Sequence, residues 1–408
     1  MSLSTQPYKG TRDFYPEDQR LLNYIMWCWT EVVESFGYEQ YNAPMLEPIE
    51  LYSAKTSEEI VNEQTYAFED RGGRKVTIRP EMTPSVSRMV AARRQELSYP
   101  LRWYSIPNVW RYERPQRGRL REHWQLNVDM FGVAGIEAEL EMIQIADAIM
   151  QRIGAKRTDY EIRINSRKLL DKRIKASGVK SDVASVIRII DRYDKTPRDD
   201  IVKMLATVVD EPEKLLKSLE QDGPSAEVKQ LQDRLEALGI TVVTTETLAR
   251  GFDYYTDIVF EVFDTDPENN RAMFGGGRYD GLVGAFGAEP VPTIGFGMGD
   301  VTLANFLQAH KLVPALSCET DLYAVLIGDV YDAAQAPITA LRQADITVAV
   351  DSTGRKLDKQ IKAADKKGIK HVLFVGEEEL ASGTYRIKNL QTGKEEALTI
   401  PEIIKQLG

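Results

Sequence analysis

The sequence predicts a protein of two or three domains that mixes strands and helices, with a helical unit inserted in the first part and a parallel α/β domain at the end. The chain has 408 residues, too many for one ordinary hydrophobic core. Hydrophobic residues make up 43% and charged residues 28%, a balance typical of folded globular proteins. Residues 166–239 are charged and helical, whereas strand patterns flank them, and strand–helix alternation after residue 321 favours a parallel sheet.

The first part begins with a helix and continues as extended chain. Apolar residues recur at helical spacing over 17–36, and Gly37 is a natural stop. Residues 38–48 contain two prolines, which favour an edge or interface strand. A short strand at 76–78 precedes a helix that Thr83 is expected to cap.

Two strands, predicted at 101–112 and 123–131, flank a polar hairpin loop. In the second strand, alternation separates an apolar face from a polar row that contains Gln125, Asn127 and Asp129. Further predicted elements are a helix at 137–153, strands at 160–164, 240–244, 258–263 and 293–299, and a helix capped by Asp300. The glycine triplet 275–277 permits close backbone approach to a ligand, although such a triplet alone is usually just a turn.

The composition excludes several classes of protein. Lys plus Arg is 52 and Asp plus Glu is 62, so the net charge of −10 excludes a uniformly basic nucleic-acid coat but not a local basic patch. Two cysteines and three scattered histidines exclude a cysteine-based zinc site and an HExxH site, so no protein-only metal site is expected. The sequence has neither a signal peptide nor an apolar run of membrane length, so no membrane association and a cytoplasmic location are expected. No Rossmann or P-loop glycine motif occurs.

Two segments are strongly basic. Residues 111–121 contain five arginines and one glutamate, a local charge of 5 − 1 = +4, and guanidinium groups bind phosphate well. Residues 351–370 also reach 7 − 3 = +4, on a predicted helix. Phosphate or RNA binding is one interpretation of each segment, and a solvated basic surface is the other.

Two further segments carry side chains that a plain strand or helix start does not need. Glu81 and Thr83 lie at a strand–helix junction, where side chains can project into a cleft. Residues 250–255 place an arginine, a carboxylate and two phenols within six positions.

Together these motifs resemble the class II aminoacyl-tRNA synthetases, and specifically the histidyl-tRNA synthetase family. The similarity follows one order along nearly the whole chain. The matching segments are 9–13 (the N-terminal signature), 37–44 (motif 1), 79–83 (the amino-acid site), 111–131 (motif 2), 250–255 (the histidine-specific motif), 276–282 (GGRYDGL), and 352–357 with 376–380 (the anticodon-binding domain).

The resemblance implies an α+β catalytic domain with a mixed, mostly antiparallel sheet. This domain would span residues 1–165 and 240–311, interrupted by a helical insertion at 166–239. A linker at 312–320 would lead to a C-terminal α/β anticodon-binding domain at 321–408. The motif 1 match implies a homodimer.

The resemblance also implies an activity, with ATP and Mg²⁺ required. Histidine would react with ATP to give histidyl-adenylate and pyrophosphate, and the histidyl group would then pass to the 3′ end of histidine tRNA. The implied roles are catalysis for Arg111 and Arg250, ATP binding for Arg111, Glu113, Arg119 and Arg278, histidine binding for Glu81, Thr83, Gln125, Asp129, Tyr254 and Tyr255, and contact with the tRNA acceptor end for Arg114 and Gln116.

Two positions depart from the family pattern. Asp129 stands where the family often has glutamate. Thr302 stands where motif 3 normally has an arginine that holds the ATP γ-phosphate, so Arg271, Arg278 or Arg119 is expected to replace it. This departure favours, mildly, a non-catalytic relative, the regulatory subunit of ATP phosphoribosyltransferase. That relative lacks the anticodon-binding domain, so residues 321–408 and the intact 250–255 motif argue against it.

An RNA-binding scaffold with a dead site and a class II enzyme for a different amino acid also fit parts of the sequence. The scaffold predicts that the polar pocket residues are lost, yet Glu81, Arg111, Gln125 and Arg250 are present. A class II enzyme for a different amino acid would not need the 250–255 motif.

Overall fold

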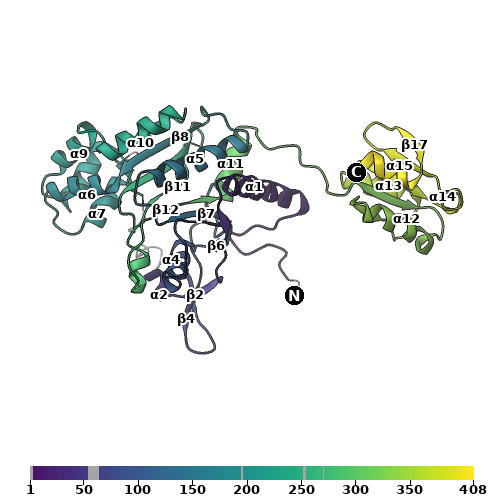
Figure 1. Cartoon of the computed structure of the whole chain (residues 1–408), viewed down its shortest axis with the longest axis horizontal. Coiled ribbons are helices and arrows are strands. Elements are labelled where there is room, and N and C mark those ends of the chain that lie inside the picture. The colour runs from purple at the N-terminus through teal and green to yellow at the C-terminus, as the bar shows by residue number, and fades with distance from the viewer. Residues whose placement is uncertain (1–2, 54–63, 194–195, 251–253, 270) are drawn as a thin grey trace. The chain divides into compact units, whose positions relative to one another are not determined.

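The computed structural model describes residues 3–53, 64–193, 196–250, 254–269 and 271–408 (Figure 1). It divides into two compact units, Met1–Val313 and Pro314–Gly408. The division falls within the segment predicted as a linker, 312–320. None of the helices in the described ranges has both the length and the apolar character needed to span a membrane.

The first unit is organised around a mixed sheet to which nine strands of the described residues belong. Two neighbouring pairs, β1 with β5 and β8 with β9, are parallel, and the other pairs are antiparallel. The mostly antiparallel sheet is therefore confirmed. Its strands are, from one edge to the other, β1 (Glu39–Gln40), β5 (Leu101–Ser105), β7 (Glu122–Phe131), β12 (Thr293–Gly299), β11 (Ala272–Arg278), β10 (Ile258–Asp264), β8 (Tyr160–Ser166) and β9 (Val242–Thr244), with β6 (Asn108–Trp110) paired to β7.

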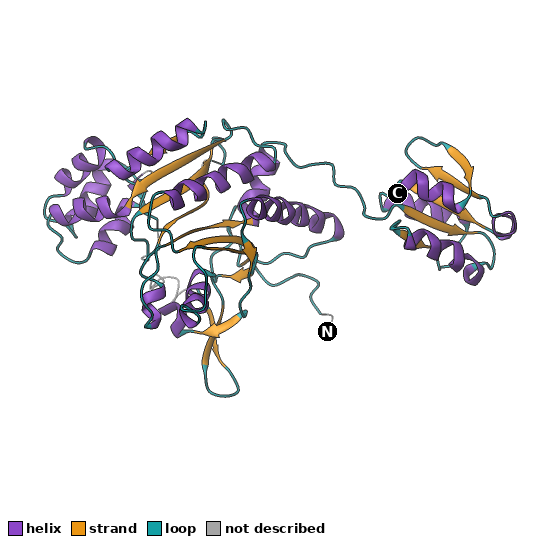
Figure 2. Ribbon diagram, viewed as in Figure 1, coloured by secondary structure: helices purple, strands orange, loops and turns teal. Residues whose placement is uncertain are grey.

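Helices cover one face of this sheet (Figure 2), and the apolar residues of that face are buried beneath them. The helices are α1 (Pro16–Ser35), α5 (Glu137–Arg152), α10 (Ala226–Ala237) and α11 (Asp300–Ala309). On β7, Leu126, Val128 and Met130 enter this core, as their alternation predicts. The intervening residues therefore lie on the opposite face of the sheet, where the candidate site is found.

A smaller sheet of three strands precedes the helix α4 (Thr83–Ala92) along the chain. Its strands are β2 (Leu46–Pro48), β4 (Lys75–Ile78) and β3 (Tyr66–Glu69), with α2 (Glu50–Ser53) alongside and η2 (Val283–Phe286) packed on α4.

Two local predictions are wrong. Thr83 is the first helical residue of α4, and Met82 occupies the N-cap without a side-chain bond. Asp300 is likewise the first residue of α11, with Gly299 at the N-cap, and its buried carboxylate accepts from the Trp124 backbone N–H and pairs with Arg12. The glycine triplet lies within β11, where it allows other groups to approach the sheet closely.

The predicted insertion is helical, but its helices belong to two cores. The helices α6 (Arg167–Ala176), α7 (Val183–Ile190), α8 (Arg198–Ala206) and α9 (Pro212–Gln221) share one cluster of buried apolar residues. In contrast, α10 buries Val228, Leu231 and Leu235 in the core of the main sheet. A parallel pair such as β8 and β9 needs a crossover connection, and α10 completes this one.

The second unit has a five-stranded sheet in the order β14 (Val348–Val350), β13 (Leu322–Leu326), β15 (His371–Val375), β16 (Tyr385–Asn389) and β17 (Glu395–Leu398). Its first three strands are parallel, as the strand–helix alternation predicts. Its helices are α12 (Tyr331–Gln343), α13 (Leu357–Lys366), α14 (Glu377–Ser382) and α15 (Ile400–Leu407). The sequence analysis missed β17, α14 and α15, which are short and carry several charged residues.

Candidate active site

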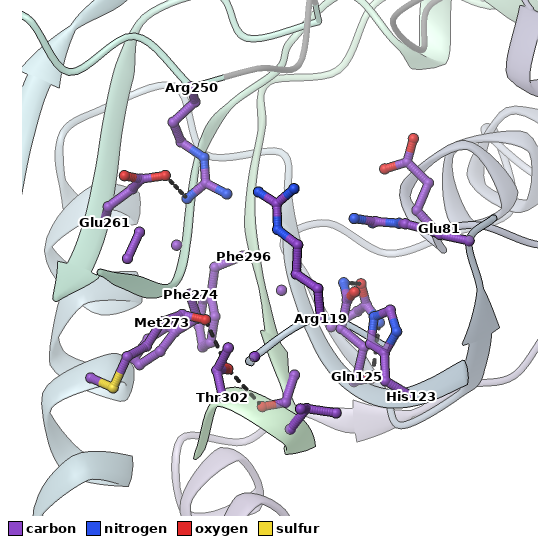
Figure 3. Close-up of a pocket in the computed structure, with 18 of the residues that line it drawn as sticks. Glu81, Arg119, His123, Gln125, Arg250, Glu261, Met273, Phe274, Phe296 and Thr302 are labelled. Atoms are coloured by element: carbon purple, nitrogen blue, oxygen red, sulfur yellow. Dashed lines mark hydrogen bonds and ion pairs between the residues drawn. The ribbon is translucent and has the colours of Figure 1, made fainter. Parts of the chain in front are cut away.

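A cavity of about 600 Å³ opens on the face of the main sheet opposite the helices. This volume is in the range of small-molecule sites. Figure 3 shows the side chains of Arg250, Arg119 and Glu81 pointing into the same space from different elements. The predicted site residues that line the cavity are Glu81, Thr83, Arg111, Glu113, Gln116, Arg119, Gln125, Arg250, Tyr254 and Tyr255.

Arg278 does not line the cavity, which contradicts its predicted role in ATP binding. Its side chain is only 6% exposed and pairs with the equally buried carboxylate of Glu139, at 2.5 Å from Nε to Oε1. Its Nη atoms also donate to the carbonyl groups of Val133 and Gly135. Arg278 therefore ties β11 to the start of α5 on the opposite side of the sheet.

Two other predicted residues are also outside the lining. Arg114 is exposed on the loop between β6 and β7, whereas Gln116 on the same loop reaches the cavity. Asp129 is buried immediately behind the wall, where the Tyr279 hydroxyl donates to its Oδ1. Tyr279 itself lines the cavity.

One end of the cavity is formed by arginine side chains. Arg111 is oriented by a bond from its Nε to the Pro80 carbonyl, at 2.9 Å. Arg119 is 63% exposed and lies 3.6 Å from Glu113, measured between Nη1 and Oε2. Including Arg250 and Arg271, four arginines and three glutamates line the cavity, so its lining carries a net positive charge suited to phosphate.

Arg250 occupies a constrained position at this end. Its φ of 56° is in the left-handed region that residues other than glycine rarely adopt, a kind of strain that clusters at functional sites. Its Nη1 donates to the Phe260 carbonyl at 3.0 Å and lies 3.7 Å from Glu261 Oε1. A Cβ at Gly275 would overlap Nη1, so this arginine needs glycine beneath it. Residues 251–253 of the same motif lie outside the described residues.

The other end of the cavity is buried and rich in phenols. The Tyr254 hydroxyl donates to Glu81 Oε2 at 3.2 Å, and both side chains are buried. Burial and the neighbouring Glu81 raise the pKa of Tyr254 well above its ordinary value. Tyr255 and Tyr279 pack against Tyr254, with ring centroids 4.9 and 5.6 Å away. This end therefore offers protonated phenols and a carboxylate to a ligand.

Polar residues of β7 form the floor between the two ends. Gln125 and Asn127, two members of the predicted polar row, line the cavity, and Gln125 Nε2 donates to Asn127 Oδ1 at 2.9 Å. His123 also lines it, which the sequence analysis missed. Burial and the neighbouring Arg111 lower the pKa of His123 to about 3, so its imidazole is neutral near pH 7. Strand alternation from Gln125 could have placed His123 on this face.

Thr302 lies in the wall near the arginine end. Its hydroxyl lies 2.9 Å from the Met273 carbonyl and 3.1 Å from the Gly299 carbonyl, so it bonds locally (Figure 3). Arg271 lines the same part of the cavity, and a Cβ at Gly118 would contact both Arg271 and Thr302. Of the three replacements expected for the motif 3 arginine, Arg271 is therefore close to Thr302, and Arg278 is excluded by its burial.

Several lining residues had no distinguishing signal in the sequence. Glu261, Met273, Phe274 and Phe296 contribute to the wall from β10, β11 and β12. Their residue types also fit an ordinary strand, so only the pairing of these strands brings them to the cavity.

Comparisons with known proteins agree with this geometry. A family model described as histidyl-tRNA synthetase matches residues 10–301, and a model described as an anticodon binding domain matches residues 323–408. The chain is 40% identical to a histidine–tRNA ligase of Leptospira biflexa, over 99% of this chain and 98% of the relative. It is 36% identical to a histidine–tRNA ligase of Thermoplasma volcanium, over 97% and 96% of the two chains.

A solved structure shares the fold. The histidyl-tRNA synthetase of Nostoc sp. PCC 7120 aligns with a TM-score of 0.80 and 23% identity, over 99% of this chain and 100% of that chain. The family models together cover most of both compact units, and the alignments cover 98% and 96% of the two relatives. The chain therefore belongs to the histidyl-tRNA synthetase family.

Proposed function

We propose that this protein is a histidine–tRNA ligase, which activates histidine with ATP and transfers it to the 3′ end of histidine tRNA. The observation that carries the proposal is that one cavity joins an arginine-lined end to a buried end of phenols and a carboxylate. The first suits the phosphates of a nucleotide, and the second suits a small polar amino acid.

In the activation step, a carboxylate oxygen of histidine attacks the α-phosphorus of ATP. A new phosphorus–oxygen bond forms as the bond to the leaving pyrophosphate breaks, and negative charge increases on the oxygens around phosphorus. Arg111 and Arg250 are proposed to stabilise this charge, because donors fixed in advance cost little reorganisation during the reaction. The bond from Arg111 to Pro80 and the Gly275 contact of Arg250 support such preorganisation.

The α-amino group of histidine is proposed to bind Glu81, Thr83 and Gln125. Glu81 is a buried carboxylate oriented by Tyr254, so it offers an ammonium group a fixed acceptor. Tyr254 and Tyr255 would enclose the side chain. Asp129 is buried beside Gly295, which lines the cavity, and it is proposed to accept a hydrogen bond from the substrate imidazole.

The outer phosphates of ATP are proposed to lie near Arg119 and Glu113, with Arg271 in place of the motif 3 arginine. Mg²⁺ would enter with ATP, and it prefers carboxylate and phosphate oxygens. Glu113 and Glu261 supply such oxygens to the cavity. The described part of the chain contains no group of three or more His, Cys, Asp or Glu side chains able to hold a metal, so the phosphates would supply further ligands.

The transfer step requires the acceptor end of the tRNA to reach the same cavity. Arg114 and Gln116 are proposed to contact it, since their loop forms one rim. The second unit is proposed to bind the anticodon. A homodimer through β1 is proposed because β1 is at an edge of the main sheet, where backbone groups can pair with a second copy. A cytoplasmic location remains a prediction from sequence.

The test is histidine-dependent exchange of pyrophosphate into ATP by the purified full-length protein, with the other amino acids as controls. We expect exchange with histidine alone, and aminoacylation of histidine tRNA when it is added. Exchange with a different amino acid would overturn the proposed specificity. Absence of exchange with every amino acid would favour a regulatory subunit of ATP phosphoribosyltransferase.

A further inference from the structure

Residues 8–12, which we call the N-terminal strap, contact the base of the basic loop that links β6 to β7. At this base the backbone N–H of Arg111 donates to the Arg121 carbonyl at 2.8 Å. The N–H of Arg121 in turn donates to the Gly10 carbonyl, also at 2.8 Å. Arg121 therefore lies between the start of the loop and the strap.

The side chain of Arg121 adds a second connection. It is buried, although it does not belong to the cavity lining. Its Nη1 donates to the Tyr8 hydroxyl at 2.9 Å, and its Nε donates to the Glu113 carbonyl at 3.2 Å. The guanidinium carbon lies 4.0 Å from the ring centroid of Tyr112 and 5.4 Å from that of Tyr8, so the charge faces two aromatic rings. One guanidinium thus joins the strap to the segment that brings Arg111 and Glu113 to the cavity.

The strap has two further fixed points. Gly10 has a φ of 89°, and a Cβ there would lie 2.8 Å from Arg121 Cγ, so a side chain at this position would displace the arginine. Arg12 pairs with Asp300 at the start of α11, at 2.7 Å from Nη2 to Oδ2, and the same carboxylate accepts from the Trp124 N–H of β7. The strap is therefore attached to α11 and, through Asp300, to β7 as well as to the loop.

We propose that the N-terminal strap holds the loop between β6 and β7 in its reactive position, and that Tyr8 and Arg121 are positioning residues for Arg111 and Glu113. This inference rests on the proposed function, in which Arg111 stabilises charge at the α-phosphate. It assigns a role to an arginine of the basic loop that the proposed function leaves unused, and to the segment that precedes α1.

The consequence is expected in the rate rather than in histidine binding. A guanidinium acts on a transition state only from a narrow range of positions, and a misplacement of about 1 Å can lower a rate by about 100-fold. The side chain of Arg111 is oriented by Pro80, but its backbone is held by Arg121. Histidine, in contrast, is proposed to bind Glu81 and Tyr254, which come from segments outside the loop.

The test measures pyrophosphate exchange by the full-length protein and its variants. Arg121→Met keeps an unbranched side chain but removes its donors, and it should lower kcat about 30-fold while the KM for histidine stays within about twofold. Tyr8→Phe removes one oxygen atom from a half-exposed side chain, so it should fold normally and lower kcat about threefold. Arg163→Met is the matched control, since Arg163 also lies over an aromatic ring, that of Phe263 at 4.1 Å, but outside the cavity. It should keep the wild-type kcat.

A double variant tests whether the two residues act as one unit. If Tyr8 acts through Arg121, Tyr8→Phe combined with Arg121→Met should be no slower than Arg121→Met alone. Additive losses would overturn the inference. A wild-type kcat in Arg121→Met, or a loss that takes the form of a raised KM for histidine with a normal kcat, would also overturn it.

Hydrogen–deuterium exchange gives a measurement that does not depend on activity. The amides of Arg111 and Arg121 donate to carbonyl groups at the base of the loop, so both should exchange about tenfold faster in Arg121→Met and keep their protection in Arg163→Met. Equal protection in Arg121→Met and in the wild-type protein would overturn the inference. Wild-type protein without pyrophosphate exchange would contradict the proposed function, and the amide comparison would still decide whether the strap holds the loop.

Discussion

At one end of the cavity, Arg119 and Arg271 reach the ligand space from a loop and from the residue before β11, and Arg119 is 63% exposed. At the other end, Tyr254 and Tyr279 are 8% and 2% exposed, and each donates to a carboxylate. Charge acts over several ångströms, so phosphate can be bound by arginines in more than one position. Short buried hydrogen bonds depend on the position of each atom, so the phenolic end should tolerate substitution less well.

The largest expected effect tests whether Arg278 belongs to the arginine end of the cavity. Arg278→Ala should lower the free energy of unfolding by about 3–5 kcal/mol, because it leaves the buried Glu139 carboxylate without its partner. Arg102→Ala is the matched control, since Arg102 also makes a two-atom contact with a glutamate but is 32% exposed. That variant should lose about 1 kcal/mol or less. Denaturant unfolding measures the stability loss of both variants. A normal stability combined with a raised KM for ATP in Arg278→Ala would instead indicate that Arg278 binds the nucleotide.

The next largest effect concerns Arg250. This residue lies at the arginine end, but its side chain is held in one position, like the side chains of the phenolic end. Arg250→Ala should reduce kcat for pyrophosphate exchange by about 10²–10³, which is typical when a donor to developing charge is removed. Arg163→Ala, on β8 and outside the cavity, should leave kcat unchanged. An Arg250→Ala enzyme with a normal kcat and only a raised KM would mean that this residue binds ATP without acting on the transition state.

Sequence reasoning was most successful where a motif and a strand period agree. The polar and apolar faces of β7 follow from alternation, and the floor residue Gln125 follows from them. It failed at Arg278, because a motif gives the residue type but does not say on which side of the sheet the side chain lies. That choice depends on the pairing of β7 with β12 and of β12 with β11, and β7 is far from the other two strands in sequence.

The phenolic end should also show a pH dependence that the arginine end lacks. Burial raises the pKa of Asp129 to about 7, against about 3.9 for an ordinary aspartate. Between these values the folded protein holds a proton that the unfolded chain has released, so the free energy of unfolding falls as pH rises from about 4 to about 7. Asp129→Asn should remove about 3 kcal/mol of this dependence. Unfolding of both proteins at several pH values across this window measures it, and parallel curves would contradict the raised pKa.

The smallest expected effect tests whether charge at the arginine end is interchangeable in position. Arg271→Ala should raise the KM for ATP about tenfold and leave the KM for histidine within about twofold, because Arg271 lies beside Thr302, where the motif 3 arginine is missing. Arg163→Ala again serves as the control. Equal changes in the KM values for ATP and histidine would contradict the proposal that Arg271 holds the γ-phosphate.

A second variant makes that test independent of local distortion. Thr302→Arg, introduced into Arg271→Ala, should recover most of the affinity for ATP, because it returns a guanidinium to the same wall from α11. The hydroxyl bonds of Thr302 to the Met273 and Gly299 carbonyl groups are lost in this variant, but those carbonyls can bind an arginine or water. Recovery would show that the arginine end needs a positive charge near Thr302, and that either α11 or the residue before β11 can supply it. No equivalent exchange is expected at the phenolic end, where Tyr279 and Asp129 must keep their atoms in register.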